Sequence, residues 1–325
     1  MRVGAVIVAH QSAACLRPCL EACLRHAAAD AGIVVVDNAS TDGSASVASG
    51  VPGVTVLPNP DNVGFAAAVN QGFRALPSAD LVLVLNPDAI LQTSIAPLVR
   101  CFDDPQTAIA AGALCGPDGQ PQRGFTVRRF PTVASLVLEN LAINRFWSGN
   151  SVNRRWRCLD LDLTRAQDVE QPAGALLLIR RDAWRTVGGF DNRFFPVWFE
   201  DVDFCLRIRK SGFRIRYEPT ALSVHRGGHS VRSVDWGRRQ LYWNENLLRY
   251  SGLHFNRPGQ VVIALSVAAG GVFRGTLEAL RRGSLGPLRA VGFILRAAAS
   301  ALLAAGHAAS REDWKGTREG NSERG

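Results

Sequence analysis

The first third of the chain alternates short apolar runs with helical segments, and this alternation constrains the fold more than any other feature. The apolar runs are Val3–Ala9, Ile33–Val36, Val54–Leu57, Leu81–Leu85 and Ile109–Leu114, and the helical segments between them include Cys15–His26 and Gly64–Leu76. Such a pattern is typical of βαβ units, so we predict an α/β fold with a mostly parallel central sheet and flanking helices. Because ligands of these sheets bind beyond the carboxyl ends of the strands, polar residues that end strands are the first candidates for chemistry.

Composition and charge narrow the class of protein. The 325 residues suffice for one large domain, and a charged fraction of 20% is ordinary for a globular protein. The formal net charge of +9 fits acidic partners such as nucleotide diphosphates, lipid pyrophosphates or an anionic membrane face. The chain lacks the glycine-rich fingerprints of dinucleotide oxidoreductases and P-loop NTPases and the G-x-S-x-G of α/β-hydrolases. The basic residues form no recognisable nucleic-acid motif, so we expect no nucleic-acid partner.

The seven cysteines and the first residues indicate a cytoplasmic setting. Cys15, Cys19 and Cys23 recur at helical spacing and share one face of a predicted helix, and no C-x-x-C pair occurs. Three such thiols could bind a metal, but Cys is among the most buried residue types, so we favour a buried helix face in a reducing compartment. The opening run Met1–His10 is too short for the apolar core of a secretory signal, and we interpret it as a first strand.

The patterns after residue 115 are weaker. The segment Gly116–Asp168 is rich in Arg, Trp and Asn, and we expect it to form irregular structure over a cleft that binds the second substrate, the acceptor. Ala173–Ile179 is strand-like, and Trp198–Arg209 has the pattern of a turn that opens a helix. We expect the polar end, Ser310–Gly325, to be disordered.

Two late apolar segments, Val261–Phe273 and Val291–Gly306, are surrounded or interrupted by arginines. Both fall short of the roughly 20 apolar residues that span a bilayer. Apolar faces with basic flanks can lie in a membrane interface, or they can pack on the catalytic domain or on a second subunit, and the pattern leaves both open. The arginines are Arg257, Arg274, Arg281, Arg282, Arg289 and Arg296.

Two polar clusters in the first third are candidates for a nucleotide-binding site. Asp37 and Asn38 follow a buried strand, where a carboxylate can accept hydrogen bonds from a nucleobase or ribose, although a plain Asx turn explains the same residues. Asn62 and Gly64 precede a predicted helix that carries Asn70, and the free amides at the start of that helix could face a phosphate.

Asn86 and Asp88 end the fourth apolar run. Oxygen-bearing groups at alternate positions can hold a hard divalent cation, Mg²⁺ or Mn²⁺, which would bridge a donor's phosphates, but a turn set by Pro87 explains the residues equally well. His225 ends another strand-like run, and paired with Asp88 it is a candidate metal ligand. Phosphates could be faced by Arg226 and Arg232.

A cluster of acids lies at the start of the helix predicted near residue 200. Glu200, Asp201 and Asp203 stand among aromatic residues that include Trp198, and desolvation there would raise a carboxylate's pKa and suit a general base. An ordinary helix start, with the acids paired to Arg207 and Arg209, is the alternative.

Taken in order, these clusters resemble glycosyltransferase family 2, especially its rhamnosyltransferase-like branch, from about Val3 to Tyr250. The motifs that carry the resemblance are VDNASTDGS, NVGFAAAVNQG, LNPDA, GALLLIRRDAWRTVGGFD, FEDVDFCLR and the later His225. The resemblance implies a GT-A fold with a Rossmann-like nucleotide-binding half. It places this catalytic domain at residues 1–255, with halves at about 1–115 and 116–255, followed by amphipathic helices at 256–309 and the tail at 310–325.

The resemblance also implies roles for particular residues. Asp37 would contact the donor nucleoside, with Asn38, Asn62, Gly64, Asn70 and Asn86 in the same donor site. Asp88 would bind the divalent cation together with His225. Asp201 would be the catalytic base beside Glu200, and the acceptor side would be lined by Gly174, Ala175 and Trp198. Where the wider family often has Asp-x-Asp, this chain has Asn86-Pro87-Asp88, so one charge is missing from the expected metal site.

These roles predict an inverting glycosyltransferase. We expect it to move a sugar, L-rhamnose from dTDP-rhamnose by preference, to a hydroxyl of a glycan or polyprenyl-pyrophosphate-linked acceptor. We expect it in the cytoplasm, with peripheral contact to the inner face of the cytoplasmic membrane among the alternatives. A UDP-hexose donor, a nucleotidyltransferase and a non-catalytic sugar- or lipid-binding relative also stay open, and the sequence predicts no oligomeric state.

Overall fold

The computed structural model describes residues 1–227 and 234–319, with side chains up to residue 305, and it divides into two compact units. The sheet unit comprises Met1–Phe130 and Arg154–Val234, and the helical unit comprises Pro131–Asn153 and Asp235–Gly325. The boundaries predicted from the sequence near residues 115, 255 and 309 stay predictions, and residues 320–325 of the predicted tail lie outside the described part.

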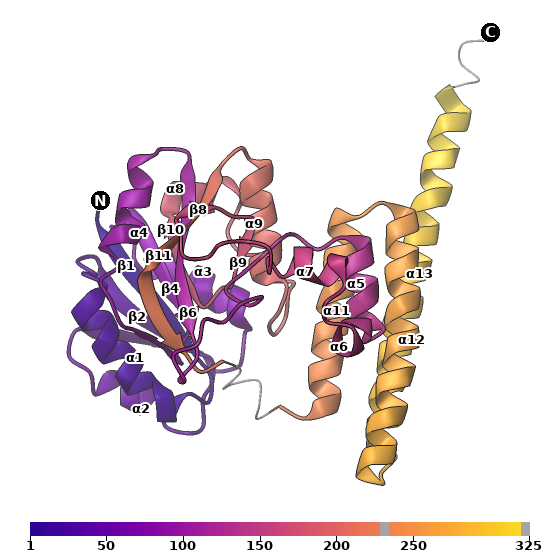
Figure 1. Ribbon diagram of the computed structural model, residues 1–325, viewed down its shortest axis with the longest axis horizontal. Coiled ribbons are helices and arrows are strands. Elements are labelled where there is room, and N and C mark those ends of the chain that lie inside the picture. The colour runs from indigo at the N-terminus through magenta and orange to yellow at the C-terminus, as the bar shows by residue number, and fades with distance from the viewer. Residues whose placement is uncertain (228–233, 320–325) are drawn as a thin grey trace. The chain divides into compact units, whose positions relative to one another are not determined.

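The sheet unit is built on a central sheet, nine-stranded over the described residues (Figure 1). The first four strands along the chain run parallel to one another, as the βαβ pattern predicts. The later strands make the sheet mixed, because β10 is antiparallel to both of its neighbours while β6 and β11 are parallel to each other. In spatial order the path is β3 (Val54–Pro58), β2 (Gly32–Asp37), β1 (Val3–Ala9), β4 (Leu81–Leu85), β10 (Leu176–Arg180), β6 (Thr107–Cys115), β11 (Arg214–His225) and β5 (Ala89–Leu91), with β8 (Gln167–Asp168) also pairing β11.

Helices cover both faces of this sheet, since the strands are apolar on both sides. In β1, Ala5 and Ile7 enter one core cluster while Val6 and Val8 enter the other, as the period of two requires. The first cluster includes side chains of α1 (Ala13–His26), α2 (Ser44–Ser49) and α4 (Ala96–Arg100), and the second those of α3 (Phe65–Ala75), α8 (Arg181–Thr186) and α9 (Glu200–Lys210). Cys15, Cys19 and Cys23 of α1 are buried, as we predicted for a helix face.

Short elements complete the sheet unit. The 3₁₀-helix η1 (Cys101–Asp103) follows α4, and β7 (Val127–Arg128) pairs with β9 (Gln171–Pro172) in a second small sheet.

The prediction of irregular structure at Gly116–Asp168 is wrong for its middle, which contains α5 (Val133–Asn140), α6 (Ile143–Phe146) and α7 (Ser151–Trp156). The eight residues of α5 are too few for the helical period to stand out in the sequence.

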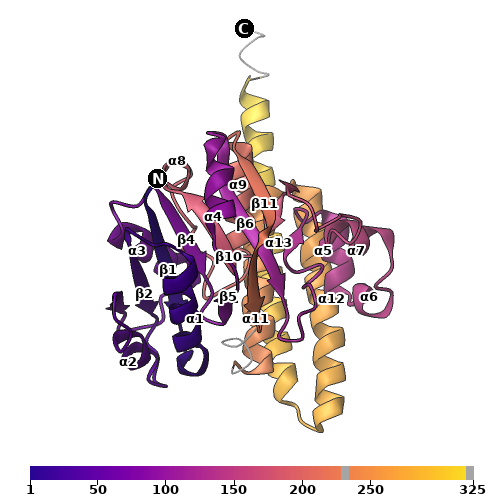
Figure 2. The ribbon, with the colours of Figure 1, turned by 60° about the vertical axis from the view of Figure 1, so that its left-hand side comes forward.

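The helical unit packs α5 and α11 (Trp236–His254) on two long helices, α12 (Arg257–Arg282) and α13 (Gly286–Glu319), which run side by side (Figure 2). Glycines of α12 permit this packing, because a Cβ atom on Gly270 would meet the backbone of Asn140 and one on Gly275 would meet Val291.

Helices α12 and α13 are longer than the apolar segments from which they were predicted. Both helices extend beyond the apolar segments and include the flanking arginines, so that α12 has 26 residues and α13 has 34. By length and composition, Arg257–Arg282 and residues 286–305 could each cross a membrane. The expectation that both segments are too short to span a bilayer is therefore wrong by this criterion alone.

Candidate active site

The carboxyl edge of the parallel strands gathers most of the predicted site residues. Asp37 ends β2, Asn86 follows β4, and His225 ends β11. Because β10 is antiparallel, its first residue Leu176 lies opposite Leu85, which brings the preceding residues to the same edge. The backbone N–H of Asn86 donates to the carbonyl of Ala175 at 3.0 Å. Donor-side and acceptor-side candidates therefore meet at one edge of one sheet.

Asp88 and His225 form a buried pair at this edge. The Oδ1 atom of Asp88 lies 3.4 Å from Nε2 of His225, and the side chains are 5% and 2% exposed. The Nδ2 atom of Asn86 lies 3.4 Å from the same imidazole nitrogen. Burial acts to raise the pKa of Asp88, but the hydrogen bond and charge of His225 outweigh it, so that the pKa lies below its usual value.

These residues fit a divalent cation. A carboxylate oxygen and an unprotonated imidazole nitrogen are both electron-pair donors, and at 3.4 Å their repulsion is relieved by a shared proton or a cation. An oxygen and a nitrogen ligand suit Mn²⁺, which would supply positive charge for the phosphates of a donor. Within the described ranges, the chain offers no group of three His, Cys, Asp or Glu residues that could hold a metal ion alone.

Gln122 and Phe125 orient the His225 ring, and sequence reasoning missed both. His225 Nδ1 lies 3.1 Å from Oε1 of Gln122, and Gln122 Nε2 donates to the backbone carbonyl of His225 at 2.7 Å. An amide oxygen only accepts, so this contact requires a hydrogen on Nδ1, and in the neutral imidazole the lone pair is then on Nε2, where it can bind a ligand. The ring of Phe125 stacks on the imidazole with centroids 5.3 Å apart.

Asp201 is held at the same edge by groups of the chain segment that precedes β10. Its Oδ2 atom accepts hydrogen bonds from the backbone N–H of Gly174 at 3.1 Å and from Nε2 of Gln171 at 3.3 Å, while Oδ1 accepts from the N–H of Val202 at 2.8 Å. Burial raises the pKa of Asp201 although these backbone hydrogen bonds lower it. A half-buried carboxylate with a raised pKa, fixed by three donors, has the properties of a general base. Gln171 had no signal in the sequence.

Glu200 is more deeply buried than its neighbour. The side chain is 5% exposed, and Oε2 has no hydrogen-bond partner among the described residues. Burial and then the adjacent Asp201 raise the pKa of Glu200 well above its usual value. The two residues before it, Trp198 and Phe199, have φ angles of 81° and 70°. Successive non-glycine residues in this left-handed region store backbone strain, as often occurs at functional sites.

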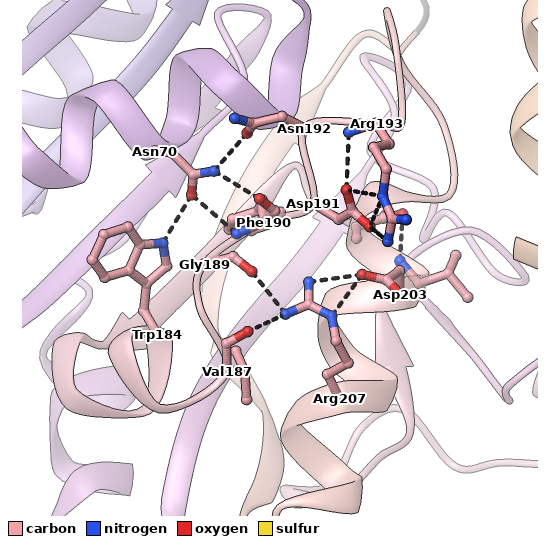
Figure 3. A network of polar contacts seen from close by, with 12 residues as sticks. Asn70, Trp184, Val187, Gly189, Phe190, Asp191, Asn192, Arg193, Asp203 and Arg207 are labelled. Carbon is pink, nitrogen blue, oxygen red and sulfur yellow. Dashed lines mark hydrogen bonds and ion pairs between the residues drawn. The ribbon is translucent and has the colours of Figure 1, made fainter. Parts of the chain in front are cut away.

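The third acid of the cluster has a structural partner. Asp203 pairs with Arg207 at 2.7 Å, and Arg207 Nη1 also donates to the carbonyls of Val187 and Gly189 (Figure 3). The alternative of a salt-bridged helix start therefore holds for Asp203, while Asp201 is bonded to Gly174 and Gln171 at the sheet edge.

Asn70 takes part in a neighbouring network, also shown in Figure 3. Its Oδ1 atom accepts from the indole of Trp184 and from the backbone N–H of Phe190, each at 3.0 Å. Its Nδ2 atom donates to the carbonyl of Phe190 and to Asn192. Both polar atoms are thus used to fasten the loop after α8 to α3, and we leave Asn70 out of the donor site proposed below.

Asp37 has a side-chain oxygen without a hydrogen-bond partner in the described part of the chain, whereas the amide of Asn38 is bonded on both sides. The Oδ2 atom of Asp37 accepts from the N–H of Ser40 at 3.1 Å, but its buried Oδ1 has no hydrogen-bond partner in the described part of the chain. Asn38 donates to the carbonyl of Gly64 and accepts from Asn59, which ties the loop after β2 to the start of α3.

The start of α3 is already partly covered by the chain. The carbonyl of Pro196 accepts from the N–H of Phe65 at 2.8 Å, and a Cβ atom on Gly64 would lie 2.9 Å from the ring of Phe195. Asn62 accepts from the N–H of Gly64 and shapes this turn.

Of the two arginines predicted to face phosphates, the structure describes Arg226. Arg226 is exposed, and its backbone N–H donates to the carbonyl of Asp88. Arg232 lies outside the described residues.

Comparison with known proteins identifies the family. The model described as glycosyl transferase family 2 matches residues 5–182, more than half of the chain. N-acetylglucosaminyl-diphospho-decaprenol L-rhamnosyltransferase of Mycobacterium tuberculosis is 32% identical over 216 residues, which cover 61% of this chain and 67% of that relative. The chain belongs to glycosyl transferase family 2. A second model, described as the N-terminal domain of galactosyltransferase, matches residues 162–227 of this family 2 enzyme.

A further relative and a solved structure agree with this family 2 assignment. Rhamnosyltransferase WbbL of Escherichia coli K12 is 26% identical over 156 residues, covering 47% of this glycosyltransferase and 55% of the relative. Mannosyltransferase PcManGT from Pyrobaculum calidifontis, solved in complex with GDP-Man and Mn²⁺, has a TM-score of 0.51 at 18% identity and covers 93% of this chain and 87% of its own. The predicted GT-A fold and the rhamnosyltransferase-like branch are confirmed.

Proposed function

We propose that this glycosyltransferase inverts the donor's anomeric carbon and transfers L-rhamnose from dTDP-rhamnose to a hydroxyl of a lipid-linked or polysaccharide acceptor. Two relatives named as rhamnosyltransferases support the sugar, and the diphospho-decaprenol in the name of the first supports a lipid-linked acceptor. The observation that carries the proposal is Asp201, fixed by Gly174 and Gln171 at the sheet edge that also holds the Asp88–His225 pair.

The donor binds along the ends of β2 and β4 in this proposal. The free Oδ1 of Asp37 accepts a hydrogen bond from the nucleobase or ribose, since a buried acceptor without a partner is costly until a ligand supplies one. Asn38, Asn62 and Gly64 shape the loops beside it through their hydrogen bonds, and Asn86 lies next to His225.

Asp88 and His225 would hold a divalent cation, Mn²⁺ or Mg²⁺, with Asn86 beside them. When bound, the cation neutralises negative charge on the leaving nucleoside diphosphate. His225 is kept in the ligating tautomer by Gln122, which fixes the imidazole before the donor arrives. Arg226, which follows His225, adds positive charge toward the diphosphate.

The reaction is a single displacement. Oδ1 or Oδ2 of Asp201 takes the proton of the acceptor hydroxyl as that oxygen forms a bond to the anomeric carbon, while the bond from this carbon to the diphosphate oxygen breaks and its electrons leave with the diphosphate. Attack from the face opposite the leaving group inverts the configuration. Gly174, Ala175 and Trp198 line the acceptor side, where a side chain on Gly174 would lie 3.4 Å from Cβ of Asp201. With these substrates, the enzyme would act in the cytoplasm at the inner face of the cytoplasmic membrane.

The first experiment is a donor screen by calorimetry with Mn²⁺ present, followed by transfer to a diphospho-polyprenol-linked N-acetylglucosamine. We expect dTDP-rhamnose to bind and to be consumed with release of dTDP. Preference for a UDP-hexose would replace the donor, and release of pyrophosphate from a nucleoside triphosphate would indicate a nucleotidyltransferase. If folded protein binds none of the donors with or without acceptor, the chain is a non-catalytic relative. The matched variants are Asp88→Ala, which should lose donor affinity, and Asp118→Ala in an exposed turn, which should keep it.

A further inference from the structure

Helix α12 presents a row of large apolar side chains to solvent. This row, the α12 stripe, is 37% to 76% exposed and comprises Val261, Val262, Leu265, Val272, Phe273, Leu277 and Leu280. Spacings of three, four and seven residues, as from Val262 to Leu265, Phe273 to Leu277 and Leu265 to Val272, place the row on one side of the helix. The opposite side is packed inside the helical unit through buried residues such as Ile263 and Val267. An exposed apolar row of this length marks a surface that binds something.

Helix α13, which packs beside α12, also exposes apolar side chains, but with a different chemistry. Leu288, Phe293, Leu295 and Leu303 are between 39% and 65% exposed. Arg289 and Arg296 are also exposed and lie seven residues apart, so they share one side of the helix among these apolar groups. The surface of α13 is therefore both apolar and cationic.

Charge indicates what this surface binds. Residues 257–305 contain six arginines and a single acid, Glu278, which is paired with Arg282 of the same helix. Apolar side chains suit the acyl region of a lipid bilayer, and guanidinium groups suit the phosphates at its surface. The combination is complementary to an anionic bilayer.

The same charges disfavour two other arrangements. If α13 crossed the bilayer, Arg289 and Arg296 would enter the hydrocarbon, together with charged residues of α11 such as Arg238 and Glu245, since α11 packs against both long helices. If a second copy covered the surface across a two-fold axis, the exposed arginines of both copies would meet without acids to pair them.

We propose that α12 and α13 form a docking surface that lies in the interface of an anionic lipid bilayer without crossing it. The α12 stripe enters the boundary between headgroups and acyl chains, and Arg289 and Arg296 contact lipid phosphates. This attachment would bring the enzyme to the plane in which a lipid-linked acceptor is held.

Vesicle flotation of the full chain tests the proposal, with phosphatidylglycerol-containing and pure phosphatidylcholine vesicles. We expect the wild-type protein to bind the anionic vesicles more tightly and to lose this difference at high salt. Leu265→Gln with Leu277→Gln should lower the partition coefficient by roughly tenfold or more on both vesicles. Arg289→Gln with Arg296→Gln should lower it by on the order of tenfold on anionic vesicles alone.

Matched controls come from α1, which exposes Leu24 and Arg25 on the sheet unit. Leu24→Gln and Arg25→Gln should leave vesicle binding unchanged, and thermal melts should show that all variants are folded. The proposal is overturned if wild-type protein does not bind vesicles, if the controls lose as much binding, or if bound protein resists extraction at alkaline pH as a spanning helix would. A dimer that the leucine variant dissociates, with vesicle binding intact, would assign the surface to a second copy. Vesicle binding needs no sugar transfer, so failure here leaves the proposed reaction standing.

Discussion

Two sets of buried polar side chains in the sheet unit differ in whether their polar atoms have hydrogen-bond partners. The loop network of Figure 3, formed by Asn70, Trp184, Asp203 and Arg207, directs its polar atoms at one another and at backbone carbonyls. By contrast, Asp37 Oδ1 at the end of β2 and Glu200 Oε2 at the start of α9 are buried without a partner among the residues that the structure describes. Buried polar groups are almost always hydrogen-bonded in folded proteins. The loop network holds the fold, whereas the two unpartnered oxygens are candidates for contact with a ligand.

The contrast is sharpest on α9, where Asp201 and Asp203 lie two residues apart. Asp203 is 1% exposed and is neutralised by Arg207, whereas Asp201 is held by neutral donors and keeps a raised pKa because of burial. The first arrangement stabilises a folded chain, and the second prepares a base.

The largest expected effect is on the rate of the Asp201→Asn variant. Loss of a general base costs about 10²- to 10⁴-fold, so we expect kcat to fall by about 10³-fold while donor affinity is nearly unchanged. Because the base must be deprotonated and its pKa is raised, the wild-type rate should increase with pH through a value above the usual range of an aspartate. Steady-state rates with calorimetric donor binding test this. Turnover at the wild-type level would transfer the role of base to Glu200.

Asp203→Asn is the matched substitution on the same helix and should act on stability instead. Removing one partner of a buried ion pair leaves Arg207 uncompensated and costs about 3 kcal/mol in the free energy of unfolding. Urea unfolding followed by circular dichroism measures this, and kcat per folded molecule should stay within a few-fold of wild type. A loss of rate comparable with that of Asp201→Asn, in protein of normal stability, would erase the distinction between the two acids.

The sequence predicts the edge of the sheet better than the groups that orient its ligands. Strands β1 and β4 are continuous apolar runs and were predicted to the residue, so the positions of Asn86 and Asp88 followed from where β4 ends. The insertion of β10 between β4 and β6 was not predictable, because an apolar run has no sign of its direction or neighbours.

The sequence also does not predict which side chains form hydrogen bonds with the site residues. Gln122 and Gln171 are single polar residues in segments without periodicity, and only the folded chain brings them to His225 and Asp201. Asn70 shows the reverse limit, since the sequence predicts a donor-site residue but does not show that the loop after α8 uses both of its polar atoms. The roles of the remaining site residues stay predictions.

Gln122→Ala tests whether the contact of Gln122 with His225 supports metal binding. Loss of a group that fixes a metal-binding imidazole typically lowers metal affinity by about 10- to 100-fold. We expect a loss in this range for Mn²⁺ titrated calorimetrically in the presence of dTDP, with the fold intact. Gln106→Ala, at an exposed position in a turn, is the matched control and should leave affinity unchanged. Equal affinities for both variants would show that Gln122 only completes the packing around His225.

Glu200→Gln should have the smallest effect, and its sign depends on pH. Because burial raises the pKa of Glu200 in the folded protein, its contribution to stability is fully present below the unfolded pKa of about 4.3 and is lost as pH rises through the folded value. The amide cannot ionise, so the variant should become more stable than wild type by about 1 kcal/mol or more at alkaline pH, with little gain at pH 4. Asp88 has the opposite sign, since its lowered pKa gives stability that is present above the unfolded pKa of about 3.9 and is lost as pH falls through the folded value. Unfolding free energies of Glu200→Gln, Asp88→Asn and wild type at several pH values measure both slopes. If the Glu200→Gln difference does not change with pH, the carboxyl is not desolvated in the folded state and belongs with the satisfied groups of the loop network.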